Sequence, residues 1–240
     1  VSGAFRYYDE GVLVQVPLSP ARITVEPQPE LNLRYFLQRD VRSDDPNTRS
    51  VVEPAEPFVL AVMAQNDGAG AARGLRIEST QPRIIENEKG LLIDFEITGV
   101  RVNGQDAERS LTANFGDIAP GGIAIAEWQM ESTLQGHFKK YSAIFEHLSP
   151  FGDARLSLIK SVEIHELIHV VDAYPGAGGD ALPDFLVNDR PDPNDLPDTL
   201  YLSNGSVVSV GLGVNGRATG AIENLRVAVS ADMPSGWGYL

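Results

Sequence analysis

Apolar residues occur along the chain in short runs that glycine, proline and asparagine interrupt. Several runs alternate apolar with polar positions, which is the two-residue period of a strand with one buried face. This pattern predicts many short strands and no long helix. The predicted strands are 12–16, 22–25, 31–36, 58–64, 74–78, 91–102, 123–130, 138–145, 199–202, 207–210 and 225–229.

Turn residues support the same architecture. Asn103-Gly104 directly follows an apolar run and predicts a type I′ hairpin. The 23 glycines and 16 prolines fit tight turns and edge strands better than long helices. The predicted fold class is therefore all-β, with an immunoglobulin-like β-sandwich.

Three segments are predicted. Residues 1–50 carry N-terminal strands packed on or preceding the sandwich, residues 51–148 form the sandwich, and residues 149–240 form a loop-rich C-terminal β region. The apolar, glycine-containing end at 234–240 predicts that the chain is a piece of a longer protein.

Four turn motifs occur in a defined order within 51–148. They are Asn66-Asp67-Gly68 after a strand, a small-residue turn at 71–74, Pro120-Gly121 before a late strand, and Gly136 at the start of a final strand. This order resembles bacterial immunoglobulin-like surface modules of the cell-adhesion-related (CARDB-type) family. The resemblance implies a non-catalytic sandwich displayed at the cell surface. The segment 81–117 is longer than the corresponding part of such modules.

Composition excludes several classes of function. The 240 residues include 33 acidic and 19 basic side chains, and the net charge of −14 would repel nucleic acid. Without cysteine, the chain has no disulfide, thiol nucleophile or cysteine-ligated metal. No apolar run approaches ~18 residues, so no direct membrane insertion is expected.

One short motif suggests metal chemistry. The motif His165-Glu166-Leu167-Ile168-His169 resembles the HExxH of zincin metallopeptidases, without their flanking pattern. On a helix, His165 and His169 would bind zinc from one face and Glu166 would act as general base. Residues 161–166 alternate like a strand, however, and on a strand the two histidines lie ~13 Å apart. Both readings stay open, and the preferred prediction assigns no catalytic residue.

An acidic, proline-rich loop is predicted at 180–198. Its carboxylates are the hard oxygen ligands that calcium prefers, although no EF-hand spacing is present. The other reading is a solvated connector that the prolines stiffen. The candidate calcium ligands are Asp180, Asp184, Asp189, Asp192, Asp195 and Asp198.

These observations together predict a non-catalytic structural or adhesion module of a larger secreted or cell-surface bacterial protein. The expected partners are neighbouring domains of the same long chain, other surface proteins or glycans. Two alternatives remain: a zinc metallopeptidase that uses His165, Glu166 and His169, and a calcium-dependent carbohydrate-binding module.

Overall fold

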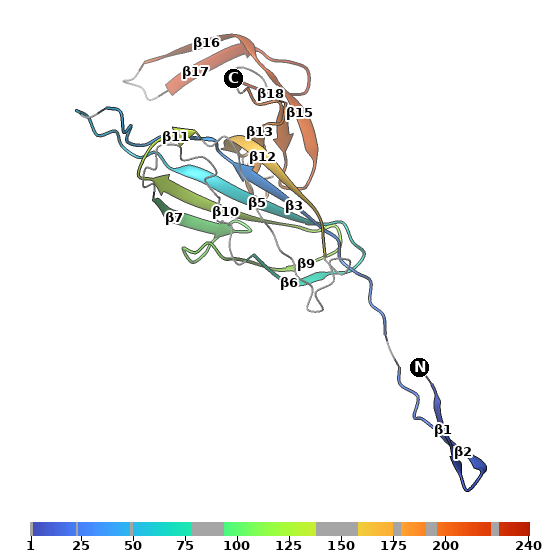
Figure 1. Ribbon diagram of the computed structural model, residues 1–240. Coiled ribbons are helices and arrows are strands. Elements are labelled where there is room, and N and C mark those ends of the chain that lie inside the picture. The colour runs from blue at the N-terminus through green and yellow to red at the C-terminus, as the bar shows by residue number, and fades with distance from the viewer. Residues whose placement is uncertain are drawn as a thin grey trace.

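The computed structural model describes residues 2–22, 24–48, 50–77, 94–137, 158–174, 179–190, 196–221 and 226–240. These residues form strands, turns and irregular segments, and none of them is helical (Figure 1). The prediction of an all-β fold is thus confirmed. Within the same residues there is accordingly no helix that could cross a membrane.

The strands are joined by connections that range from tight turns to segments of more than ten residues. They are β1 (Ala4–Asp9), β2 (Val12–Pro17), β3 (Leu31–Leu37), β4 (Asp40–Val41), β5 (Phe58–Asn66), β6 (Ala72–Ile77), β7 (Phe95–Val102), β8 (Gln105–Asp106), β9 (Ala113–Ile118), β10 (Ile123–Ser132), β11 (Gly136–His137), β12 (Ile159–Val171), β13 (Asp184–Asn188), β14 (Thr199–Tyr201), β15 (Val207–Leu212), β16 (Val214–Ala221), β17 (Arg226–Asp232) and β18 (Trp237–Tyr239).

Ten strands form one mixed sheet in the order β18-β15-β14-β13-β12-β3-β5-β10-β7-β8. β3 runs parallel to β12, and β15 runs parallel to β18, whereas the other neighbours are antiparallel. Four separate two-stranded sheets are β1–β2, β4–β11, β6–β9 and β16–β17. The pairings do not show an immunoglobulin-like sandwich. The large sheet takes strands from all three predicted segments.

β6 and β9 cover one face of the large sheet. Alternate residues of its central strands, such as Tyr35 and Trp128, are buried on that face. Phe115 and Ile118 of β9 belong to the same apolar cluster. The indole Nε1 of Trp128 donates a hydrogen bond to the carbonyl of Ser110 at 2.8 Å, which satisfies the polar atom of the ring.

The opposite face of the sheet is covered by its own later strands. Phe36, Met63 and Ile125 form a second apolar cluster with Phe185 of β13 and Tyr201 of β14. The Phe36 and Phe185 rings stack with centroids 4.1 Å apart. β10 and β14 lie on opposite sides of β3 in the strand order, so the sheet must curl strongly to bring their side chains together.

Most of the predicted strands that lie among the described residues are present. Asn103 and Gly104 have φ of 50° and 74°, which confirms the type I′ hairpin between β7 and β8. The predicted strand at 22–25 is wrong, because its described residues lie in an irregular linker between Pro20 and Pro27. The predicted strand at 138–145 lies outside the described residues.

The predicted acidic loop contains an element that its composition conceals. β13 lies inside 180–198, and all five of its residues are buried. Its apolar centre, Phe185-Leu186-Val187, pairs with β12 on one side and β14 on the other. The prediction of a continuous loop was therefore wrong, because three apolar residues are enough for a strand between two paired neighbours.

Candidate functional site

The HExxH motif lies on a strand rather than on a helix. His165 and Leu167 of β12 are buried, whereas His169 is exposed. The pairing of β12 with β13 shifts register between Leu167 and His169, which marks a β-bulge at Ile168. The structure therefore does not bring the two histidines together around one position.

His165 is held by an acidic residue that the sequence assigned to calcium. Its Nδ1 lies 2.7 Å from Oδ1 of Asp189, and its ring packs against Phe36 and Tyr201 with centroid distances of 5.4 and 4.5 Å. A carboxylate only accepts hydrogen bonds, so a neutral imidazole in this position carries its proton on Nδ1.

The same carboxylate binds a second donor. The hydroxyl of Tyr201 donates a hydrogen bond to Oδ2 of Asp189 at 2.8 Å. Burial, followed by the adjacent Asp189 carboxylate, raises the pKa of Tyr201 above its ordinary value. Tyr201 consequently keeps its proton and acts as a donor, and Asp189 joins β12 to β14.

The other nitrogen of His165 has no hydrogen-bond partner among the residues that the structure describes. Nε2 is buried and lies 3.7 Å from Oε2 of Glu163. Glu163 is itself paired with Nε of Arg34 on β3 at 3.2 Å, and the Arg34 guanidinium lies 5.5 Å from the centroid of the Tyr201 ring. We call these five residues the His165 cluster: Arg34, Glu163, His165, Asp189 and Tyr201.

The His165 cluster has part of a catalytic triad but no nucleophile. In a triad, the free nitrogen of the histidine accepts a proton from a serine or cysteine within hydrogen-bond distance. Nε2 of His165 makes no such bond within the described residues, and the histidine is only 9% exposed. The arrangement is suited to joining β3, β12 and β14 through polar contacts.

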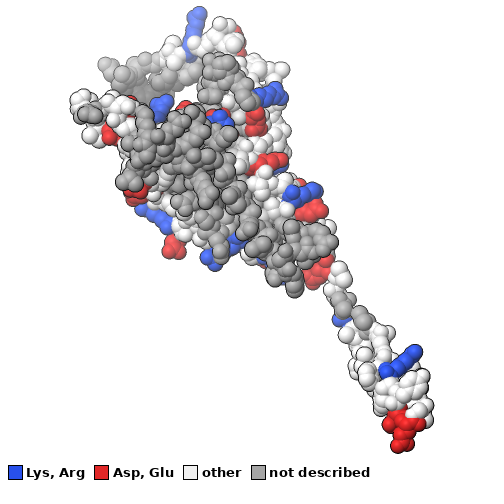
Figure 2. Space-filling view, in the orientation of Figure 1, with Lys and Arg blue, Asp and Glu red and all other residues white. Residues whose placement is uncertain are grey.

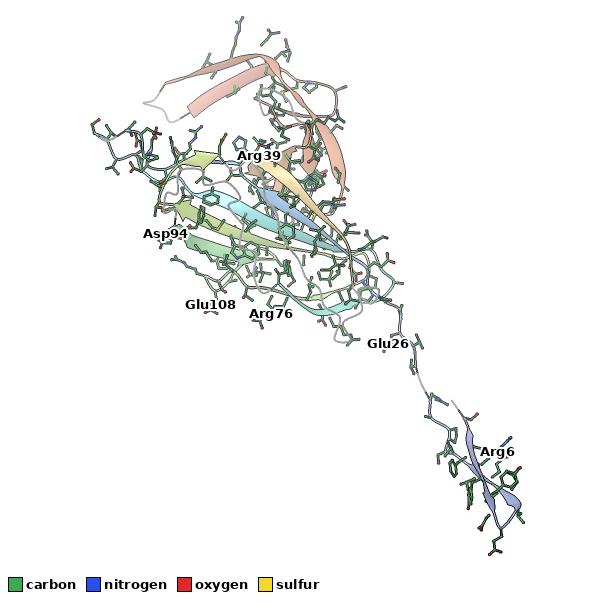
Figure 3. All side chains as sticks on the ribbon, viewed as in Figure 1. Arg6, Glu26, Arg39, Arg76, Asp94 and Glu108 are labelled. Atoms are coloured by element: carbon green, nitrogen blue, oxygen red, sulfur yellow. The ribbon has the colours of Figure 1, made fainter. Side chains whose placement is uncertain are left out.

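Glu166 points in a different direction from His165, because successive residues of a strand face opposite sides. Its Oε2 lies 3.3 Å from the Arg39 guanidinium and accepts a hydrogen bond from Nδ2 of Asn188 at 3.3 Å. Glu166, Arg39 and His169 line a cleft of about 490 Å³, and Figure 3 shows Arg39 beside the ends of β3 and β12. The general base of the zincin reading is therefore engaged by an arginine.

The buried acidic residue of β13 serves the backbone. Asp184 accepts hydrogen bonds from the N–H groups of Ala173 at 2.8 Å and Ser203 at 2.7 Å. Asp180 accepts a hydrogen bond from the hydroxyl of the same Ser203 at 2.8 Å. These two candidate calcium ligands thus bind the segments that follow β12 and β14 to the start of β13 and the residues before it.

The remaining candidate calcium ligands are placed as follows. Asp198 accepts a hydrogen bond from the N–H of Arg190 at 2.7 Å, and Asp189 belongs to the His165 cluster. Asp192 and Asp195 lie outside the described residues. Among the residues that the structure describes, no three histidine, aspartate or glutamate side chains converge in a metal-binding arrangement.

Three members of the His165 cluster were missed by sequence reasoning: Arg34, Glu163 and Tyr201. Arg34 and Glu163 occupy polar positions in their strands, and Tyr201 lies in a short strand with no motif around it. Their role depends on the pairing and curl of the sheet, which leave no signal in the local sequences.

A second cleft, of about 590 Å³, lies along β7 and β10 and is lined in part by Glu127, Arg101 and Val170. Burial raises the pKa of the Glu127 carboxyl above its ordinary value, and the nearby Arg101 lowers it to a smaller extent. The folded protein therefore binds a proton at Glu127 more readily than the unfolded chain does.

This shift predicts a pH-dependent effect of substitution. A raised carboxyl pKa supplies stability below the ordinary pKa, and that stability is lost as pH rises through the pKa of the folded state. Glu127→Gln should raise the free energy of unfolding at neutral pH, and the gain should shrink in acid. Urea unfolding at neutral pH and at a pH below the ordinary carboxyl pKa measures the gain under each condition. The exposed Glu96→Gln is the control. A gain that does not depend on pH would contradict the prediction.

Comparison with known proteins gives no relative. No protein-family model matches the chain, and no curated protein or solved structure is significantly similar to it. The resemblance to CARDB-type modules stays a prediction from the order of the turn motifs.

Proposed function

We propose that this chain is a non-catalytic structural or adhesion module of a larger secreted or cell-surface bacterial protein. One observation carries the proposal: the HExxH motif lies on β12, which buries His165 beside Asp189 and leaves His169 with Glu166 in the cleft beside Arg39, so the two histidines lie in different surroundings. His165 is enclosed by aromatic rings, and Glu166 is paired with Arg39. Two of the three side chains that would perform hydrolysis, His165 and Glu166, are thus occupied in contacts between strands.

The finer proposal is an immunoglobulin-like sandwich within 51–148. The packing of β6 and β9 over the large sheet supports it, since this part of the chain has two apolar layers. The turn motifs also occupy suitable places: Asn66 ends β5, and Pro120-Gly121 precedes β10. The proposed partners are neighbouring domains, other surface proteins or glycans.

The proposal predicts that the isolated protein neither holds stoichiometric zinc nor hydrolyses protein. Metal analysis of material purified without added zinc, together with a casein assay, measures both properties. Wild type, Glu166→Gln and the control Glu163→Gln should show sub-stoichiometric zinc and no proteolysis. One zinc per chain, with hydrolysis that Glu166→Gln alone abolishes, would overturn the proposed function in favour of a peptidase.

A further inference from the structure

The N-terminal strands form a hairpin that extends away from the rest of the molecule. Among the described strands, β1 and β2 pair only with each other, and Figures 1 and 2 show them projecting from the body. In the turn between them, Glu10 and Gly11 have φ of 48° and 84°. The side chains of both strands are exposed, Val14 only partly. An isolated two-stranded hairpin is at best marginally stable in water, so this element needs a surface to pack against.

One face of the hairpin is apolar except at its turn end, where Asp9 pairs with Val12. Residues directly opposite each other in an antiparallel pair share a face, and the pairs Phe5–Val16 and Tyr7–Val14 lie side by side. The Phe5 and Tyr7 ring centroids are 5.6 Å apart, as expected for neighbours on one face. We call this the hairpin face; its apolar members are Phe5, Tyr7, Val12, Val14 and Val16, and all of them except Val14 are 42–66% exposed. Asp9 lies on the same face at its turn end.

The linker after the hairpin is anchored to the body at its far end. The N–H of Asp67 donates a hydrogen bond to the carbonyl of Glu30 at 2.8 Å, and the N–H of Gly70 donates one to Gln28 at 3.1 Å. Prolines at 17, 20, 27 and 29 favour an extended chain between hairpin and body. The hairpin face is therefore held away from the apolar surfaces of its own chain.

A second exposed apolar surface lies at the other end of the molecule. Leu212, Val214, Met233 and Leu240, here called the C-terminal patch, are 47–61% exposed. They surround Gly213, where an added Cβ would lie 2.7 Å from Leu240 and 2.8 Å from Met233. Figure 1 shows β16 and β17 far from β1 and β2.

The distribution of charge favours contact between these two ends. Residues 1–17 contain one arginine and two acidic residues, and residues 204–240 contain two of each. The remaining chain thus carries a net charge of −13 out of −14. Two copies that meet through their middle surfaces would repel each other, whereas a contact between the two ends joins nearly neutral surfaces.

We propose that the hairpin face of one copy of this chain packs on the C-terminal patch of a second copy. One contact of this kind covers both apolar surfaces. Asp9 and Glu10 at the tip of the hairpin, visible as the acidic end in Figure 2, oppose insertion into an anionic membrane. The contact is head-to-tail, so it extends into short filaments unless rotation closes a ring. This inference rests on the proposed function and names a partner for it.

Complementary variants test the proposal. Phe5→Ser/Tyr7→Ser disrupts the hairpin face, and Val214→Lys/Met233→Lys disrupts the C-terminal patch. All four side chains are exposed, so both variants should unfold in urea as wild type does. In analytical ultracentrifugation, wild type should form a concentration-dependent series of species, and each variant alone should be monomeric. An equimolar mixture should form dimers that do not extend, because each variant retains one intact end.

Tyr8→Ser is the matched control, because Tyr8 lies on the opposite face of the same hairpin and is exposed. It should associate as wild type does. A monomeric wild type at millimolar concentration would overturn the inference, as would variants that still associate or a mixture that stays monomeric. Binding of monomeric wild type to anionic vesicles, lost in the hairpin variant, would assign the face to a membrane instead. None of these results affects the peptidase test, so the two proposals fail separately.

Discussion

Asn66→Ala should lower the free energy of unfolding by about 3 kcal/mol or more, since each buried polar group left without a partner costs ~1–3 kcal/mol. Asn66 is fully buried at the end of β5. Its Nδ2 donates hydrogen bonds to the carbonyls of Gly70 at 2.8 Å and Ile118 at 3.0 Å. Its Oδ1 accepts from the N–H groups of Glu30 at 3.2 Å and Gly68 at 3.1 Å.

Urea unfolding of Asn66→Ala measures this loss, with Asn114→Ala as a matched control. The exposed Asn114 accepts one local hydrogen bond, from the N–H of Gly116. Its replacement should change the stability by less than about 1 kcal/mol. Equal losses in the two variants would mean that Asn66 does not act as the junction between β5, the linker and the turn before β10.

Gly70 lies so close to the linker backbone at Pro27 that a substitution can test this contact. A Cβ at Gly70 would overlap the carbonyl oxygen of Pro27, which belongs to the rigid backbone. Gly70→Ala should therefore displace residues 27–30 and make the linker more accessible to a protease. Limited proteolysis followed by mass spectrometry locates the cut. Gly216→Ala is the control, because its Cβ would make only an ordinary contact, 3.9 Å from Leu240, and its backbone is not left-handed. Equal cleavage of both variants would contradict the steric explanation.

The strands with strong alternation were predictable because their pattern is local. Apolar residues lie on at least one face of β3, β5 and β10, and turn residues delimit each of these runs. The parallel pairing of β3 with β12 joins residues about 130 positions apart, and no local pattern records such a pairing. β13 was missed because its buried apolar centre is flanked by the acidic residues that suggested a loop.

In the His165 cluster too, the sequence indicates individual residues but not the contacts between them. His165 and Asp189 each carried a signal in the sequence, but for two different metals. Their contact at 2.7 Å depends on the antiparallel register between β12 and β13 and on a bulge in that pairing. Sequence reasoning identified the polar residues of the region, whereas only the fold determines which of them meet.

Asp189→Ala should lower the free energy of unfolding by about 2–3 kcal/mol, because it removes the acceptor of two donors. His165 Nδ1 and the Tyr201 hydroxyl both lose their partner in the apolar surroundings of Phe36. The cost is that of two orphaned donors rather than of a lost surface charge, for which the expected change is below about 1 kcal/mol.

A double-mutant cycle separates these explanations. Tyr201→Phe alone should cost about 1 kcal/mol, because it removes one hydrogen bond and leaves the carboxylate paired with His165. In the Asp189→Ala background the same substitution removes an orphaned hydroxyl, so it should cost nothing or restore some stability. Urea unfolding of the wild type, both single variants and the double variant measures the coupling energy. Additive losses would show that Asp189 and Tyr201 act independently, and the His165 cluster would then not hold β12 and β14 together as a unit.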